Sequence, residues 1–343
     1  MAATQEPAQK RNLWGDILKL VVFLGIGLFF IYWFLLKLEP DQKQAIWNAF
    51  IAADYRWIAV AMGVSLLSHF VRALRWNLLF HPLNISPRLN TTFGAVIVAY
   101  LSNLAFPRLG EVMRCAMLRT SDDIPIEKSL GTVVTERIID TLCFAIIAVV
   151  GILVMFGQVK DWVYDGLMQK FDSLPSLTTL IVIAVTAIVV LVVCYKLFYK
   201  MLLRFAFMRK IDDFVRGCID GVKSIFHLKR KATLLFILYS VIIYFLYILG
   251  GYVIFKAIPE TASLGFTAAF VLYLFGSIGM IISQGGLGAY PVLVWQALSI
   301  YGISQSIGLA SGWLLWSSQQ ALVIIVGLPY FVYFSLAKKK LKK

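Results

Sequence analysis

Residues 232–255 form an apolar stretch without a single charged side chain. A membrane-spanning helix needs roughly 20 consecutive apolar residues, so this stretch predicts a helix that crosses a bilayer. Similar long stretches are 17–38, 57–80, 129–156, 176–198 and 307–336, and shorter or interrupted ones are 91–106, 263–283 and 287–302. Only 15% of the residues are charged, against about 25% in a typical soluble domain. We therefore expect an all-α polytopic membrane helix bundle of about eight spans, with one or two re-entrant or broken helices, forming a single domain over 1–343.

The Lys and Arg residues are distributed unevenly along the chain. The connection 196–231 contains ten of them and the tail 338–343 contains five, whereas the connections 157–175 and 256–262 contain few. Cytoplasmic loops of membrane proteins carry an excess of Lys and Arg. This pattern predicts a multi-pass protein of the inner membrane with both termini in the cytoplasm. The expected cytoplasmic segments are the N-terminus (1–16), the loop 199–231 and the basic tail 338–343.

The loop 199–231 contains a segment with helical periodicity. Phe214, Cys218, Val222 and Ile225 recur at helical spacing, with charged residues between them. Such a segment is either an amphipathic helix on the membrane surface or an ordinary solvated linker helix. The sequence leaves these two interpretations open.

The stretch "NLAFPRLGEVMR", residues 103–114, interrupts apolar sequence with a proline, a glycine and three charged side chains. Pro107 disfavours a helical preceding residue, and the N-terminus of a new helix attracts anions. Irregular backbone at membrane depth is tolerated only where it is buried in protein or lines a cavity. Since basic residues flank 91–118 on both sides, we expect a re-entrant hairpin with an internal site; two short spans and a cytoplasmic loop are the alternatives. The candidate site residues here are Asn103, Pro107, Arg108, Gly110, Glu111 and Arg114.

Two arginines lie late in the predicted span 57–80. Arg72 shares a helix face with His69 and Trp76, and Arg75 lies close to Arg72. Long basic side chains near a helix end often extend to the membrane surface. Alternatively, a guanidinium contacts a phosphate through two hydrogen bonds. Arg72 and Arg75 are therefore candidate lipid-phosphate ligands.

Two acids lie within the predicted span 129–156. Glu136 and Asp140 are four residues apart and share a helix face, while Arg137 points about 100° away. A charge at the bilayer centre costs roughly 2.5–3.5 kcal/mol. The acids could form a proton relay or cation site, or could neutralise the arginines in a network. Because isolated charges are costly, we expect Arg108, Glu111 and Arg114 to line one cavity with Glu136 or Asp140.

A second break, "SQGGLGAYP", covers residues 283–291 and contains Gly285, Gly286 and Gly288. Paired interruptions in the two halves of a chain are typical of transporters with a site near the bilayer midplane. The glycines do not follow the dinucleotide-binding pattern, and no nucleotide-, protease- or hydrolase-type motif occurs. We expect no cofactor, no metal, no nucleic-acid partner and no catalytic residue. The four cysteines are expected to be reduced packing residues.

Taken together, "RALRW", "NLAFPRLGEVMR", "TERIID" and "GGLGAYP" resemble the lysylphosphatidylglycerol synthase transmembrane family over roughly residues 15–330. The resemblance implies an inner-membrane protein that binds or flips anionic or modified phospholipids or lipid-linked sugars. Members often carry an acid after the glycine-rich run, where this chain has Ala289, Tyr290 and Pro291. Carried over by position, the resemblance implicates Asn103, Pro107, Arg108, Gly110, Glu111, Arg114, Glu136, Arg137 and Asp140.

The expected function is therefore the binding and flipping of phospholipids or lipid-linked substrates. Membrane lipids are the expected partners, with a separate lipid-modifying enzyme as a further candidate. The alternatives are an intramembrane aminoacyl- or glycosyl-lipid transferase and a non-catalytic membrane partner of a separate lipid synthase. No synthase domain or catalytic motif is recognisable in the sequence, so an enzymatic activity of this chain is not expected.

Overall fold

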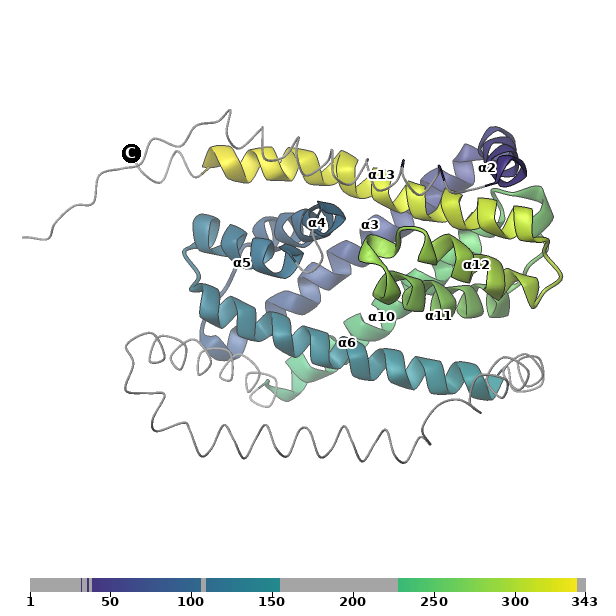
Figure 1. Ribbon diagram of the computed structural model, residues 1–343. Coiled ribbons are helices and arrows are strands. Elements are labelled where there is room, and N and C mark those ends of the chain that lie inside the picture. Colours follow the sequence, from purple (N-terminus) through teal and green to yellow (C-terminus); the bar gives the residue numbers. More distant parts are fainter. Residues whose placement is uncertain (1–31, 33–35, 37–38, 106–108, 155–227, 338–343) are drawn as a thin grey trace, which may run out of the picture.

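The computed structural model describes residues 32, 36, 39–105, 109–154 and 228–337 (Figure 1). This part of the chain is helical and contains no strand. Among the described helices, those within 55–83, 230–255 and 305–335 are long and apolar enough to cross a membrane. The all-α membrane bundle is thus confirmed. The predicted spans 17–38 and 176–198 and the helical segment expected within the loop 199–231, from Phe214 to Ile225, lie outside the described residues.

The first half of the bundle consists of a span, a helical hairpin and a second long helix. The span is α3 (Tyr55–Leu78), the hairpin is α4 (Leu89–Ala105) with α5 (Leu109–Asp122), and the long helix is α6 (Ile126–Val154). Two short elements accompany them: η1 (His81–Leu83) follows α3, and α2 (Pro40–Ala52) precedes it and packs against the C-terminal helix. α3 and α6 run in opposite directions, because Trp76 bonds Thr132 while Arg72, a turn earlier, bonds Asp140, two turns later.

The hairpin α4–α5 enters and leaves the bundle at the same end. At its base Arg88, just before α4, bonds Asp122 at the end of α5: the Arg88 backbone N–H and Nε donate to the carboxylate over 3.0 and 2.7 Å. At about 1.5 Å per residue, the 17 residues of α4 rise about 25 Å. The predicted hairpin over 91–118 is therefore present, with both of its ends at one end of the bundle.

Asn103 and Gly110 join the two arms of this hairpin next to its tip. The first backbone N–H groups of a helix have no partner within the helix, and the Asn103 side-chain oxygen accepts the Gly110 N–H over 2.7 Å. A Cβ at Gly110 would lie 2.2 Å from the Ala99 carbonyl oxygen. Only glycine allows α5 to approach α4 this closely. These two predicted site residues thus shape the hairpin itself.

The second half repeats the order of span, hairpin and long helix. Its span is α10 (Arg230–Phe255), its hairpin is α11 (Phe266–Ile282) with α12 (Ala289–Ser299), and its long helix is α13 (Gln305–Ala337). Two short 3-10 elements, η3 (Pro259–Thr261) and η4 (Gln284–Gly286), precede α11 and form the turn between the hairpin arms. At the turn Gly285, Gly286 and Gly288 adopt positive φ angles of 59°, 78° and 77°, which glycine adopts without the steric cost that other residues pay.

The two halves are inserted in opposite directions. α10 runs antiparallel to α3: the Asp54 N–H donates to the Ala257 carbonyl over 2.9 Å at one end, and Arg75 contacts Ser240 nearer the other. The hairpin α4–α5 follows the end of α3 and the hairpin α11–α12 follows the end of α10, so their bases lie at opposite ends of the bundle (Figure 1). The fold is therefore an inverted repeat, which the residue identities of the two breaks do not reveal.

The two hairpin tips meet in the interior of the bundle. α4 contacts η4, and a Cβ at Gly285 would lie 3.9 Å from the Asn103 carbonyl oxygen. α13 passes both hairpins: its Trp316 Nε1 donates to the Gly285 carbonyl over 2.7 Å, and its Tyr330 hydroxyl donates to Asn90 near the start of α4 over 2.7 Å. The two broken segments predicted from the sequence thus converge at one place.

The outer faces of α6 and α10 carry large exposed apolar side chains, including Ile138, Leu142, Ile146, Ile237 and Val241. Such contiguous apolar surface suits the hydrocarbon of a bilayer and would be a liability in water. The buried interior contains, besides apolar clusters, a set of charged side chains. This charged set defines the candidate functional site.

Candidate functional site

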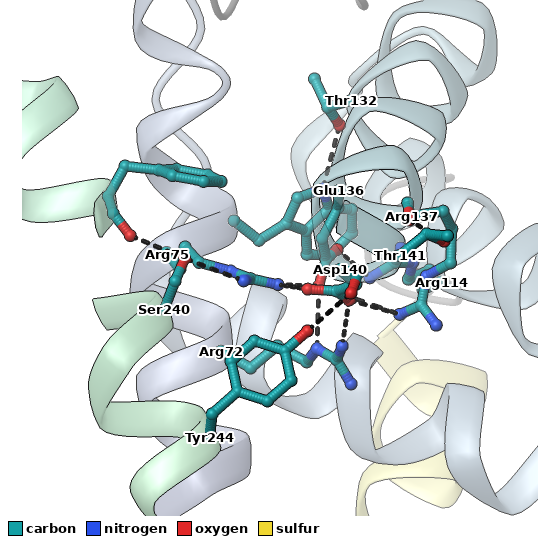
Figure 2. Close-up of polar contacts among 12 residues, drawn as sticks. Arg72, Arg75, Arg114, Thr132, Glu136, Arg137, Asp140, Thr141, Ser240 and Tyr244 are labelled. Atoms are coloured by element: carbon teal, nitrogen blue, oxygen red, sulfur yellow. Dashed lines mark hydrogen bonds and ion pairs between the residues drawn. The ribbon is translucent and has the colours of Figure 1, made fainter. Parts of the chain in front are cut away.

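Six charged side chains from three helices form a cluster inside the bundle (Figure 2). We call this set the charged cluster: Arg72 and Arg75 from α3, Arg114 from α5, and Glu136, Arg137 and Asp140 from α6. Arg75 and Glu136 are 0% exposed, the Asp140 side chain is 15% exposed, and Arg137 reaches the surface with 47% of its side chain exposed. Charged residues are almost never fully buried unless they are paired, so the pairing within the cluster decides its chemistry.

Glu136 lies at the centre of the charged cluster. Its Oε1 accepts from Arg72 Nε over 2.8 Å and from Arg75 Nη2 over 3.2 Å. Its Oε2 accepts from Arg114 Nη1 over 2.7 Å. One carboxylate thus ties together α3, α5 and α6.

Asp140, one turn after Glu136, engages the same two arginines of α3. Arg75 Nη2 donates to Asp140 Oδ1 over 2.6 Å, and Arg72 Nη2 donates to Oδ2. Two further contacts hold these arginines: Arg72 Nη1 contacts the Tyr100 hydroxyl of α4, and Arg75 Nη1 donates to Ser240 of α10 over 3.1 Å. The buried Nε of Arg75 has no hydrogen-bond partner among the described residues. Arg72 and Arg75 are therefore held by the protein and do not extend to the membrane surface. Their binding of a lipid phosphate stays a prediction.

Aromatic and hydroxyl side chains enclose the cluster. The Arg114 guanidinium lies 4.6 Å from the ring centroid of Trp76, whose Nε1 donates to Thr132 over 2.9 Å. A cation over an aromatic face is stabilised by the ring quadrupole. On the far side, the Tyr244 hydroxyl donates to the Asp140 carbonyl oxygen over 2.8 Å. These contacts position the arginines without adding any negative charge.

The cluster contains more positive than negative charge. Four guanidiniums, from Arg72, Arg75, Arg114 and Arg137, face two carboxylates, so the formal sum is +2. Next to the cluster is a small cavity, and Glu111, one of its lining residues, lowers the formal sum to +1. The acids therefore join a network with the arginines, as one of the two sequence interpretations expected, but they do not neutralise it. Three arginines and one glutamate line the cavity, and this excess of positive charge favours an anionic ligand.

Arg114 carries the part of this excess that is available to a ligand. Its Nη1 bonds Glu136, but its buried Nε and Nη2 atoms have no hydrogen-bond partner among the described residues. It lines a small cavity of about 30 Å³, which is room for about two water molecules. The other lining residues are Arg72, Val96, Ala99, Tyr100, Asn103, Glu111 and Arg137.

The cavity lies beside the first half of α6. Its lining residue Arg137 is eleven residues into α6, which corresponds to about 16 Å along the helix axis. Asn103, at the tip of the first hairpin, also lines the cavity, so the site adjoins the place where the hairpin tips meet.

The structure brings together most of the residues selected from the sequence. The charged cluster unites Arg72, Arg75, Arg114, Glu136, Arg137 and Asp140, while Gly285, Gly286 and Gly288 form the second tip and take no part in it. Pro107 and Arg108 lie outside the described residues, so the predicted cavity contact of Arg108 stays a prediction. Within the described part of the chain, no group of His, Cys, Asp or Glu residues could hold a metal ion.

Tyr100, Ser240 and Tyr244 contact the cluster but were not selected from the sequence. Each lies in an apolar stretch where a lone hydroxyl is common and carries little signal. The helical spacing of Tyr244 relative to Ser240, four residues apart, would have placed both on one face. Nothing in the sequence indicates that this face meets the arginines of α3.

Comparison with known families agrees with this architecture. The family model described as the lysylphosphatidylglycerol synthase TM region matches residues 17–327. The chain belongs to this family. The match includes both hairpins and the whole charged cluster. The membrane location of this TM-region family member is therefore established, whereas lipid flipping is a further step.

One curated relative of this TM-region protein is a "UPF0104 membrane protein" of the archaeon Methanothermobacter thermautotrophicus (strain Delta H). The two sequences are 25% identical over 315 residues, which cover 84% of this chain and 88% of the relative. The similarity thus extends over nearly the full length of both proteins. No solved structure matches the chain.

Proposed function

We propose that this protein binds the phosphate of a phospholipid or lipid-linked headgroup at the charged cluster and flips that lipid across the bilayer. The observation that supports the proposal most directly is Arg114. Its Nε and Nη2 are buried, lack partners among the described residues and adjoin a cavity in a cluster with excess positive charge. A guanidinium edge of this kind matches two phosphate oxygens.

A bound phosphate would stabilise the buried Arg114 guanidinium. Burying a charged donor without a partner is costly. A charge-assisted hydrogen bond contributes about 1.5–3 kcal/mol, and Arg114 has two buried nitrogen atoms that could each form one. A lipid phosphate would satisfy both and would lower the excess charge of the cluster at the same time.

The inverted repeat supplies a route for the headgroup. In repeat-built transporters, broken helices at the interface of two halves form the substrate site near the midplane, and movement of the halves exposes it to each side in turn. Here the hairpins enter from opposite ends, and their tips meet beside the cavity. The 30 Å³ cavity is too small for a lipid headgroup, so passage requires the hairpins to separate.

The charge distribution supports an inner-membrane orientation with both termini cytoplasmic. The end with the base of α4–α5 carries Arg88, Arg119, Lys128, Lys229, Arg230 and Lys231. The opposite end, with the base of α11–α12, carries Asp54, Glu260 and fewer basic residues. The positive-inside rule assigns the first end to the cytoplasm.

The experiment is a flipping assay in proteoliposomes with acyl-labelled fluorescent phosphatidylglycerol, in which dithionite bleaches the outer leaflet. Arg114→Gln keeps a polar side chain of similar volume but removes the charge and the guanidinium edge. Losing one charge-assisted bond of about 1.5–3 kcal/mol corresponds to a tenfold or greater loss of rate. Glu136 retains Arg72 and Arg75, so the variant is expected to fold.

Arg119→Gln is the matched control, because Arg119 lies on the same helix but is half exposed and pairs with Asp123 on the surface. Both variants are compared at equal reconstitution and after size-exclusion chromatography. The proposal requires slow flipping with Arg114→Gln and normal flipping with Arg119→Gln. Equal rates in the two variants would exclude Arg114 as the phosphate ligand.

A further inference from the structure

Glu111 faces the same cavity as Arg114 but is not part of the ion-pair network. The two residues are three apart on α5 and therefore lie on one face of that helix. Both line the cavity together with Tyr100 and Asn103 of α4. No described Lys or Arg nitrogen lies within ion-pair distance of the Glu111 carboxylate, in contrast to Glu136 and Asp140.

One oxygen of Glu111 is both buried and unsatisfied. Its Oε2 is inaccessible and has no hydrogen-bond partner among the described residues. Two neighbours of Glu111 bond elsewhere: the Asn103 side-chain oxygen accepts from Gly110, and the Tyr100 hydroxyl contacts Arg72. A buried carboxylate oxygen is costly without a donor. The cavity therefore presents an unused acceptor one helical turn from unused donors.

We propose that Glu111 is a specificity-determining residue, which accepts a hydrogen bond from an O–H or N–H group of the lipid headgroup whose phosphate is held by Arg114. This inference rests on the proposed function. Side chains three apart on a helix have Cβ atoms about 5–6 Å apart. A headgroup with a short carbon linker between phosphate and donor, such as phosphatidylethanolamine or phosphatidylglycerol, spans such a site. Phosphatidylcholine carries a cation without an N–H or O–H donor and leaves Oε2 unsatisfied.

Selection by such a site is strong, because a headgroup without the donor must leave a buried acceptor unpaired. We expect the flipping rates of phosphatidylethanolamine and phosphatidylglycerol to exceed that of phosphatidylcholine by about tenfold or more. The ammonium and the hydroxyl are two sources of the same chemistry. Two substitutions distinguish them.

The test measures all three lipids, acyl-labelled, in proteoliposomes with the full chain. Glu111→Leu removes the acceptor, and Glu111→Gln keeps an acceptor oxygen but removes the charge. In Glu111→Leu, the flipping rates of the lipids with an O–H or N–H donor should come to within about threefold of the rate of phosphatidylcholine. If Glu111→Gln lowers the flipping rate of phosphatidylethanolamine alone, the donor is the ammonium. The flipping rates of phosphatidylethanolamine and phosphatidylglycerol, each relative to that of phosphatidylcholine, give two ratios. If both ratios persist in Glu111→Gln and fall only in Glu111→Leu, the site accepts hydroxyl and ammonium donors alike.

Glu127→Gln serves as control, since Glu127 is an exposed acid in the first turn of α6, away from the cavity. The inference is wrong if Glu111→Leu leaves the lipid ratios unchanged, or if it slows all three lipids by the same factor. Failure of the proposed function has a different signature. In that case Arg114→Gln slows none of the lipids, whatever the Glu111 variants do.

Discussion

Replacing Glu136 by Gln should destabilise the protein more than any other single change in an acid of the described chain. Glu136 is fully buried and accepts from three arginines, at 2.8, 3.2 and 2.7 Å. Glutamine retains one acceptor oxygen but presents an NH₂ donor to the guanidiniums. The substitution also changes the formal charge of the six-residue cluster from +2 to +3. Removing one partner of a buried ion pair costs about 3–5 kcal/mol.

The expected loss can be measured as a shift of the melting temperature in detergent. A loss of 1 kcal/mol shifts the melting temperature by about 2 °C for large domains. The Glu136→Gln variant should therefore melt about 6–10 °C below the wild type. Glu127→Gln, on the same helix but exposed, should change the melting temperature by less than about 1 °C.

A double substitution separates lost pairing from lost packing. Arg75 is fully buried and donates to both Glu136 and Asp140 but does not line the cavity. Arg75→Met combined with Glu136→Gln should be less destabilised than the sum of the two single variants, by about 0.5–3 kcal/mol. Strict additivity, or a Glu136→Gln loss no larger than that of Glu127→Gln, would refute the assignment of Glu136 as the centre of the network.

Three further predictions concern the hairpins. Gly110→Ala places a Cβ 2.2 Å from the Ala99 carbonyl oxygen, whereas Gly63→Ala meets no atom within 4 Å. The first should lower the melting temperature by several degrees and the second should leave it unchanged or raise it. Trp316→Phe keeps an aromatic ring but removes the hydrogen bond to the second tip, and should cost about 1 kcal/mol in chemical unfolding; an unchanged unfolding midpoint would contradict that contribution. Single cysteines at Asp123 and Glu260 should label with an impermeant reagent from opposite sides of the membrane, and labelling from one side would overturn the inverted repeat.

The sequence alone predicted the class, the described spans and the two breaks, because these depend on local patterns. Stretches of apolar residues require helices in a bilayer, and proline or glycine runs end them. The shared end of the two arms of 91–118 followed from the basic residues on both sides. The position of α10, predicted as 232–255, agrees with the observed bounds Arg230–Phe255.

The pairing within the charged cluster could not be predicted. Spacing shows that Glu136 and Asp140 share a face, but not that this face meets α3. The expectation that they would pair with arginines of the first break is met by Arg114, while Arg108 lies outside the described residues. Most of their described contacts go to Arg72 and Arg75. The excess of positive charge follows from the number of arginines that tertiary packing brings together, which no local pattern encodes.

The separation of Arg72 from Glu136 along the chain has a consequence for biosynthesis. The two residues are 64 positions apart, and a ribosome adds about 5–20 residues per second. For about 3–13 s after Arg72 is made, its carboxylate partner does not yet exist. An arginine at the bilayer centre costs roughly 2.5–3.5 kcal/mol on insertion scales, and α3 carries two. We therefore expect nascent α3 to stay at the insertion machinery or near the interface and to reach its final depth only when α6 emerges beside it.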